Sequence, residues 1–418
     1  MAKLQRVNID PPKPKPIFEV NMTTLINMTD DDLKAREGHK LWELALQNMA
    51  SAIFCIGLIL FSLLLLPCEA HETIQPFEYI YQFGDSLADT GNLIRQSATT
   101  GKTVAAAHLP YGESFPGWPT GRWSDGLLII DFVAIALSLP LLNPYLESNA
   151  TFDHGANFAV AGSTALDYTF FTTNGVYNPT TNISLGDQLN WFKSHLNTIC
   201  QAPTECEKLL SKALVFVGEI GGNDVYYPLI QGKSIQEIYT YLPFIIEAIT
   251  NAVKEVTHLG AVNIVVPGNL PMGCLPAGLT LVFTGDATTY DDMGCLKELN
   301  ELALVHNNYL QESLALLRLE FPHVDIIYAD YYTAYQTILR YAANFGFEEK
   351  SLLRSCCGIG GLYNYDENRK CGSRGVPVCS NPVQYISWDG VHLTQEAYRH
   401  IAKILFQDIL GLPGIRYM

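Results

Sequence analysis

Short apolar runs of strand length recur along the chain and alternate with longer amphipathic stretches. Runs rich in β-branched or aromatic residues predict four strands: Tyr79–Phe83, Ala213–Val217, Val262–Val266 and Val324–Tyr328. Helical periodicity predicts three long helices: Ile235–Leu259, Asp291–Leu319 and Thr394–Leu410. This alternation is typical of a doubly wound α/β fold, in which helices flank a mostly parallel sheet.

One longer apolar segment, Ala52–Pro67, interrupts the polar N-terminal region. Its length suits the core of a secretory signal peptide and falls short of the roughly 20 residues that span a bilayer. Small residues after it predict cleavage before His71. Translation from Met49 would give a signal peptide over 49–70, with 1–48 as a disordered, proline-dotted upstream extension. The alternative is a membrane-anchored form that retains the segment.

Composition limits what the rest of the chain can be. The 418 residues are 48% hydrophobic, which is enough for a core, and neither a linker nor a repeat follows residue 70. Residues 71–418 are therefore predicted to form one domain. The formal net charge of −16 leaves no basic face for nucleic acid. An acidic protein is also not attracted to anionic membranes, so no stable membrane partner is expected after signal cleavage.

Eight cysteines follow residue 70, an even number that suits disulfides in a secreted protein. Cys356 and Cys357 are adjacent and are expected to take separate partners. Pairs whose members are near in sequence are plausible, such as Cys200 with Cys206 and Cys274 with Cys295. Other connectivities stay open. The spacings do not suit a zinc site, and neither a metal nor an organic cofactor is expected.

Four Asn-x-Ser/Thr sequons are present. Asn149 and Asn182 follow the predicted signal peptide, so they are expected to be glycosylated in a secreted chain. Asn21 and Asn27 precede the signal and are not expected to meet the glycosylating enzyme.

The candidate chemistry begins directly after the first predicted strand. Ser86 stands in the run FGDSLADTGN at 83–92, while Asp389 and His392 stand three residues apart near the other end. A serine hydroxyl needs a histidine to take its proton and a carboxylate to hold that histidine in the right tautomer. The three residues therefore predict a hydrolase triad. The motif differs from the common Gly-x-Ser-x-Gly nucleophile, which indicates a different class of hydrolase.

Acyl transfer also needs hydrogen-bond donors where the oxyanion forms. The candidates are the backbone N–H groups of Ser86 and Gly162 and the side-chain amide of Asn223. Alone, Gly162 suits a turn and Asn223 a loop cap. Together with Ser86, they predict an oxyanion hole.

Three carboxylates near these motifs are assigned supporting roles. Asp85 and Asp89 flank Ser86 and are expected to brace its loop through backbone hydrogen bonds. Asp224 follows Asn223 and is expected to support the site without touching substrate.

The choice of His392 over other histidines depends on its setting. Asp389 precedes it by three residues, and Gly390 permits the tight turn between them. His400 is the rival, but it is expected to lie in the following helix without a matching carboxylate. His108 and His154 fall in predicted loops, where they could at most touch substrate.

Four sequence blocks follow one another along the chain: FGDSLADTGN, GANFAVAGST, GGND and WDGVHLT. In this order they resemble the GDSL family of esterases and lipases, the plant secreted branch of the SGNH hydrolases, and the resemblance covers nearly all of 76–410. The resemblance implies a flavodoxin-like, three-layer α/β/α fold and carboxylic ester hydrolysis through an acyl-enzyme. It also implies a triad of Ser86, Asp389 and His392, with Gly162 and Asn223 in the oxyanion hole. Secretion is implied too, to the extracellular space, the cell wall or the vacuole.

The expected substrate is a small-molecule ester or a lipid. Pro110–Glu113, Pro119–Gly126 and Ala165–Asp167 resemble the plant subgroup that contains sinapine esterase and acetylajmalan esterase, which favours small esters of specialised metabolites. The aromatic run Tyr168–Phe171 could line an acyl pocket, although such clusters more often serve packing.

Two other classes of function stay open. One is acyl transfer to an alcohol acceptor through the same acyl-enzyme. The other is a non-catalytic extracellular binding protein on a hydrolase scaffold, and the presence of Ser86, Asn223 and His392 argues against it. The sequence does not indicate an oligomeric state.

Overall fold

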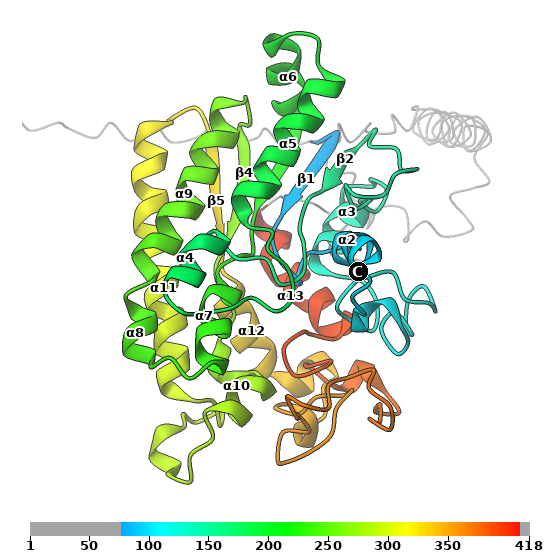
Figure 1. The fold of residues 1–418 in the computed structure, drawn as a ribbon, viewed down its shortest axis with the longest axis vertical. Coiled ribbons are helices and arrows are strands. Elements are labelled where there is room, and N and C mark those ends of the chain that lie inside the picture. The colour runs from blue at the N-terminus through cyan, green and yellow to red at the C-terminus, as the bar shows by residue number, and fades with distance from the viewer. Residues whose placement is uncertain (1–76, 410–418) are drawn as a thin grey trace, which may run out of the picture. The chain divides into compact units, whose positions relative to one another are not determined.

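One parallel sheet forms the centre of the described part of the chain, residues 77–409 of a computed structural model (Figure 1). Its strands are β1 (Tyr79–Phe83), β2 (Gly155–Asn157), β3 (Ala213–Val217), β4 (Asn263–Pro267) and β5 (Asp325–Ala329). The strand order is β2-β1-β3-β4-β5, and every neighbouring pair is parallel. This is the flavodoxin-like order of doubly wound sheets, so the predicted fold class is confirmed.

The apolar runs located four of the five strands to within one residue, but β2 was not predicted. Its three residues read Gly-Ala-Asn, which have low β-propensity and no alternation. β2 exists because its edge pairs with β1, in the register Tyr81 with Ala156. Tertiary pairing, and not local preference, therefore determines this strand.

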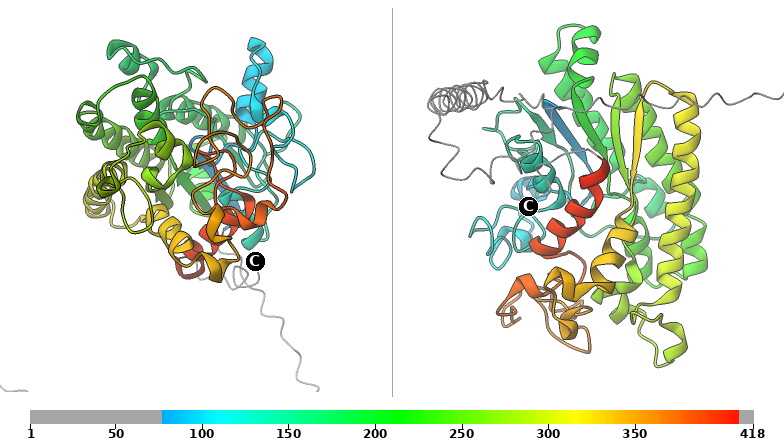
Figure 2. Two further views of the ribbon diagram at one scale, coloured as in Figure 1. Left: turned by 90° about the horizontal axis from the view of Figure 1, so that it is seen from below. Right: turned by 180° about the vertical axis from the view of Figure 1, so that it is seen from behind.

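Helices cover both faces of the sheet (Figures 1 and 2). One apolar core contains strand side chains such as Tyr81, Val215 and Ile264, and it packs against α5 (Leu185–Ile199), α9 (Leu242–His258) and α11 (Lys297–Glu320). The opposite core contains the alternate side chains Ile80, Phe216 and Val265. It packs against α3 (Ile129–Ala136), α12 (Tyr331–Arg340) and α13 (Gln395–Ile409). Alternate strand residues point to opposite faces, which produces the three layers.

Two of the predicted long helices differ from those observed. The stretch predicted as one helix from Ile235 is split into α8 (Ile235–Tyr239) and α9, whose first turn contains Pro243. Proline has no N–H to donate and clashes with a preceding turn, so it begins a helix more readily than it continues one. α11 begins at Lys297 and not at Asp291, because the preceding residues turn at Gly294, where φ is +80°. The third predicted helix is α13.

The remaining helices are short. The α-helices are α2 (Asn92–Thr100), α4 (Tyr168–Thr173), α6 (Pro203–Leu210), α7 (Gly222–Ile230) and α10 (Pro276–Leu281). The 3₁₀ helices are Ala105–Ala107, Met272–Cys274, Ala287–Thr289, Ala342–Phe345, Glu349–Ser351 and Pro382–Gln384. Over residues 77–409, no helix is long and apolar enough to cross a bilayer.

Four disulfides staple the described residues. Cys200 pairs with Cys206 and Cys274 with Cys295, as predicted. The adjacent cysteines take separate partners, as expected: Cys356 pairs with Cys379 and Cys357 with Cys371. The described residues, 77–409, all fall within one compact unit. The predicted extension 1–48, the signal peptide 49–70 and the two N-terminal sequons lie outside the described residues.

Candidate active site

The predicted site residues meet at the carboxyl edge of the sheet. Gly162 follows β2, Ser86 follows β1, and Asn223 follows β3 in the first turn of α7. The strand order reverses between β1 and β3, and doubly wound sheets bind ligands at such a switch point. These residues line one cavity together with Asp389 and His392.

Ser86, His392 and Asp389 form a continuous chain of hydrogen bonds. His392 Nε2 lies 2.7 Å from Ser86 Oγ, and His392 Nδ1 lies 2.7 Å from Asp389 Oδ2. The residues are buried, with 8%, 6% and 7% of their surface exposed, respectively. Gly390, at φ +102°, makes the turn between acid and base, and a Cβ there would fall 2.2 Å from the Tyr365 ring.

Asp389 is held as a carboxylate by several donors. Its Oδ1 accepts the backbone N–H groups of Val391 and His392, and its Oδ2 also accepts the hydroxyl of Tyr111 at 2.7 Å. Burial opposes the charge, but the His392 ring and these hydrogen bonds lower the pKa of Asp389 to about 2. The acid can therefore orient the His392 ring and stabilise its protonated form.

The segment around Trp123 packs against the histidine. The Trp123 ring lies 4.9 Å from the His392 ring, centroid to centroid. Its neighbour Arg122 forms a buried two-point ion pair with Asp131 in the first turn of α3, with both N–O distances at 2.7 Å. Asp125 Oδ1 accepts the backbone N–H of Gln395, at the start of α13, at 2.7 Å. The segment that resembled a family subgroup thus anchors the wall beside His392.

The candidate oxyanion donors have different settings. The backbone N–H groups of Ser86 and Gly162 meet no acceptor within residues 77–409. Gly162 has φ +84°, and a Cβ there would lie 2.6 Å from Thr180, so only glycine fits. The Asn223 amide instead donates to Asp85 Oδ2 and to the Ser163 carbonyl, at 3.0 Å each. These bonds orient the amide, and an oxyanion would have to share one of its protons.

Hydrogen bonds from side chains to backbone groups hold the loop that contains Ser86. Gln188 of α5 accepts the N–H of Gly84 and donates to its carbonyl, at 2.9 and 2.8 Å. Asp85 Oδ1 accepts the N–H of Leu87 at 2.9 Å. Asp89 accepts four backbone N–H groups: Gly91, Asn92, Leu93 and Ala161. The predicted bracing by Asp85 and Asp89 is confirmed.

Two further carboxyl groups, Asp224 and Glu219, are buried beside the site. Asp224 accepts the backbone N–H groups of Ala165 and Leu166, and burial raises its pKa to about 7. Glu219 is hydrogen-bonded to Asp85, and burial together with the Asp85 charge raises the pKa of Glu219 well above its ordinary value. This pair therefore retains a proton.

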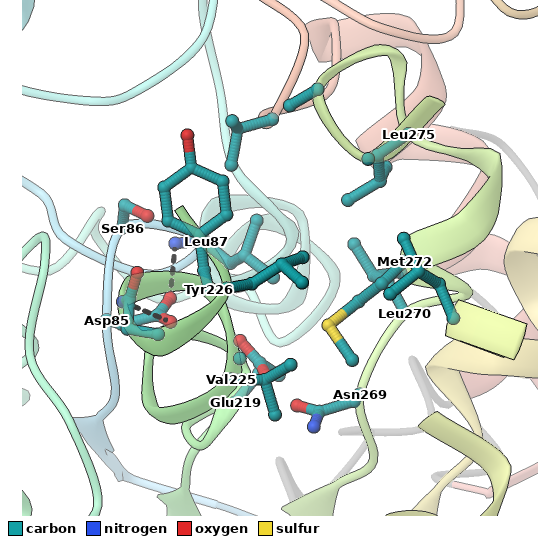
Figure 3. A pocket seen from close by; sticks show the side chains of 17 residues that line it. Asp85, Ser86, Leu87, Glu219, Val225, Tyr226, Asn269, Leu270, Met272 and Leu275 are labelled. Atoms are coloured by element: carbon teal, nitrogen blue, oxygen red, sulfur yellow. Dashed lines mark hydrogen bonds between the residues drawn. The ribbon is translucent and has the colours of Figure 1, made fainter. Parts of the chain in front are cut away.

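A second cavity adjoins the first and shares Ser86, Asn223, Tyr226 and Val391 with it. Figure 3 shows this second cavity, with leucine, valine and methionine side chains along its walls and Asp85, Glu219 and Asn269 at its polar side. Neither Gly162 nor His392 lines it. Ser86 therefore lies between a cavity that contains the candidate hydrogen-bonding groups and a mainly apolar one.

The rival histidines lie away from Ser86. His400 packs between Phe345 and Phe347, and its Nε2 lies 3.0 Å from Glu396 Oε1. The prediction that it lacks a carboxylate partner was wrong, because Glu396 precedes it by one helical turn. Neither His108 nor His154 lines either cavity at Ser86.

The other sequence candidates are on the surface or in the core. Asn149 and Asn182 are exposed, which suits glycan acceptors. The aromatic run of α4 packs in the core, where Phe170 contacts Phe171 and Tyr241, and it lines neither cavity at Ser86. The common packing role of aromatic clusters applies here. Over residues 77–409, no group of three or more His, Cys, Asp or Glu side chains is placed to hold a metal.

Sequence reasoning did not identify several residues that shape the site. Tyr111 and Trp123 stood in segments noted only for their resemblance, and Gln188 and Glu219 had no assigned role. Glu219 lies two residues before the GGND block, and this proximity was the available signal. Gln188 offered none, because its partner Gly84 lies 104 residues away.

The fold is a doubly wound α/β sheet, with a buried serine, histidine and aspartate hydrogen-bonded together at its switch point, an arrangement typical of serine hydrolases. The family model described as GDSL-like Lipase/Acylhydrolase matches residues 80–405, and the chain belongs to this family. Its relatives include named esterases, so the protein is a carboxylic ester hydrolase.

Several relatives are similar over most of their length. Acetylajmalan esterase 1 of Rauvolfia serpentina is 51% identical over 353 residues, covering 84% of this chain and 92% of the relative. Acetylajmalan esterase 2 of the same plant is 52% identical, covering 84% and 96%. GDSL esterase/lipase At1g28590 of Arabidopsis thaliana is 42% identical, covering 88% and 91%. A solved phospholipase A1 from Streptomyces albidoflavus NA297 aligns with 69% of this chain and 91% of its own, at 11% identity and a TM-score of 0.31, too low to bear on function.

Proposed function

We propose that the protein hydrolyses small carboxylic esters through an acyl-enzyme on Ser86. The observation that supports this most directly is the hydrogen-bonded chain from Ser86 Oγ through His392 to Asp389. The hydroxyl of Ser86 attacks the ester carbonyl while His392 Nε2 takes its proton. The N–H groups of Ser86 and Gly162 and the amide of Asn223 stabilise the oxyanion.

The cycle then closes by ordinary acid and base steps. His392 gives its proton to the leaving alcohol as the C–O bond breaks, which leaves the acyl group on Ser86. His392 next takes a proton from water, whose oxygen attacks the acyl carbon, and returns a proton to Ser86 Oγ as the acid departs. Asp389 keeps its charge throughout and holds the His392 tautomer.

Small esters of specialised metabolites are the favoured substrates. Relatives of about half-identical sequence are named acetylajmalan esterases, and the chain covers more than nine-tenths of their length. A turnover screen of the purified chain across acetyl, aromatic and long-chain esters tests this. Higher kcat/KM for long-chain lipid esters would contradict it.

We also propose that the protein is secreted, with Met49 as its start and glycans on Asn149 and Asn182. The four disulfides support an oxidising compartment, and both sequons are exposed. N-terminal sequencing of the secreted chain should begin near residue 71, and glycosidase should lower its mass. A retained apolar segment would refute cleavage.

Paired histidine variants test the proposed catalytic roles. Ser86→Ala and His392→Gln should each lower kcat on p-nitrophenyl acetate by roughly 10⁴-fold, since they remove the nucleophile and the base. His400→Gln is the matched control, because this histidine also contacts a carboxylate but lies away from Ser86. It should retain wild-type turnover. A fluorophosphonate should label wild type but not Ser86→Ala, and near-normal turnover by Ser86→Ala would overturn the assignment.

A further inference from the structure

The mainly apolar cavity beside Ser86 contains a buried amide without partners. Asn269 is only 1% exposed. Neither the Oδ1 nor the Nδ2 of its side chain has a hydrogen-bond partner within residues 77–409. An unpaired buried polar group is costly, and native structures contain few of them. This amide lines the cavity, so a group on a ligand can pair with it.

The position of Asn269 is rigidly determined. It follows β4, the next strand across the sheet from β3, and Asn307 of α11 binds both its backbone N–H and its carbonyl, at 2.8 and 3.0 Å. A Cβ built on Gly222 would lie 3.4 Å from Glu219 Oε1 and 3.8 Å from Asn269 Oδ1, so the two side chains converge there. Figure 3 shows them together at one end of the cavity.

Reaction geometry indicates which part of an ester occupies this cavity. The leaving oxygen must face His392 to receive its proton, and the oxyanion must face the N–H of Gly162. Both residues line the other cavity and not this one. The remaining substituent of the tetrahedral carbon is the acyl chain, so it points toward the side lined by Leu87, Val225 and Met272.

The charge near the amide narrows the class of acyl group. The adjacent Asp85 and Glu219 carboxyls carry negative charge between them and would repel a second carboxylate. A cation is disfavoured too, because Asp85 is already hydrogen-bonded to Leu87, Asn223 and Glu219 and the remaining walls are mainly apolar. A keto or hydroxyl oxygen fits both constraints, because it is neutral and can accept a hydrogen bond from Asn269 Nδ2.

We propose that this cavity is the acyl subsite and that Asn269 selects acyl chains bearing a neutral keto or hydroxyl oxygen. This proposal rests on the proposed function of Ser86. The selected oxygen pairs with the amide that otherwise stays unpaired. A plain alkanoyl chain occupies the same walls but leaves Asn269 without a partner. The subsite therefore discriminates between acyl groups of equal length by a hydrogen bond.

The test compares matched substrates in two proteins. Purified wild type and Asn269→Leu are assayed on p-nitrophenyl 4-oxopentanoate, 5-oxohexanoate and 6-oxoheptanoate, each against the plain alkanoate with the same carbon count. Wild type should prefer the oxo ester by about tenfold or more in kcat/KM at one length, as expected for one buried hydrogen bond. Asn269→Leu should lose that preference, so the oxo ester and the plain ester of each length should have about the same kcat/KM.

The controls separate this proposal from others. Asn269→Leu should melt no lower than wild type, because it removes no side-chain hydrogen bond. If it fails to fold, Asn269→Ser should show a reduced but measurable preference. An equal preference in wild type and variant, or none at any length, overturns the subsite. Failure of the proposed function would look different, since plain esters would then not turn over, or would turn over equally in Ser86→Ala.

Discussion

Two buried carboxyl groups, Asp389 and Glu219, lie at the same edge of the sheet, and their pKa values are shifted in opposite directions. Asp389 is 7% exposed and has its pKa lowered to about 2, whereas Glu219 is 3% exposed and has its pKa raised well above the ordinary value. Burial opposes the charge in both. The difference comes from partners, because Asp389 faces a histidine ring and three further hydrogen-bond donors, while Glu219 faces another carboxylate.

This contrast assigns different chemistry to identical functional groups. A carboxylate that stays charged can stabilise the protonated His392 ring during acyl transfer. A carboxyl group that keeps its proton can donate a hydrogen bond to Asp85, which in turn orients the Asn223 amide. Changing each acid to its amide should therefore have very unequal effects.

The largest effect is expected for Asp389→Asn. The amide keeps the shape but removes the charge and favours the wrong His392 tautomer, so kcat should fall by roughly 10³- to 10⁴-fold. Steady-state kinetics on an aryl ester measures the loss, and circular dichroism checks the fold. A loss below tenfold would show that the Asp389 charge is not needed.

A smaller effect is expected for Tyr111→Phe, which removes one donor from the buried Asp389 carboxylate. Activity should fall by about tenfold, and stability by about 1–3 kcal/mol, because a charged acceptor loses a partner. Tyr335→Phe is the matched control, since its buried hydroxyl has no partner within residues 77–409. Equal losses in both variants would contradict a specific role for Tyr111.

The pH dependence of the unfolding free energy tests the raised pKa of Asp224. Its pKa rises from the ordinary 3.8 to about 7 in the folded state, so the native protein keeps a proton that the unfolded chain releases. This contribution to stability is present below about pH 4 and is lost as pH rises toward 7, with a slope of at most about 1.4 kcal/mol per pH unit. Asp224→Asn should flatten that slope in urea titrations at several pH values. An unchanged slope would mean that Asp224 is charged throughout.

The smallest effect is expected for Glu219→Gln. If the carboxyl already holds a proton, an amide can still donate to Asp85, and kcat should fall by less than about tenfold. The same assay used for Asp389→Asn gives a direct comparison. A loss as large as that of Asp389→Asn would show that Glu219 acts as a charged group. The contrast drawn between Asp389 and Glu219 would then be wrong.

Much of this protein follows from local patterns. The apolar runs located β1, β3, β4 and β5, and the motif residues Ser86 and His392 lie together as their chemistry requires. The break before α9 is also a local feature, because Pro243 favours the start of a helix at that point, although the apolar periodicity continues on both sides of it. Such features are local because a strand, a turn or a proline constrains only its neighbours.

Other features depend on chain segments that only folding brings together. β2 requires the edge of β1, and Tyr111 reaches Asp389 across 278 positions of sequence. The same is true of Asn269. Only the packed structure shows that its side-chain amide has no hydrogen-bond partner within residues 77–409. No periodicity encodes these contacts.

The sequence by itself thus determined the fold class, the family and the candidate catalytic residues, because each is encoded in a local pattern or a compact motif. The tertiary structure alone decided which acids have raised pKa values, which donors hold Asp389 and which residues line the two cavities at Ser86. Those properties depend on desolvation and on distances between remote residues, and both are set only when the layers pack.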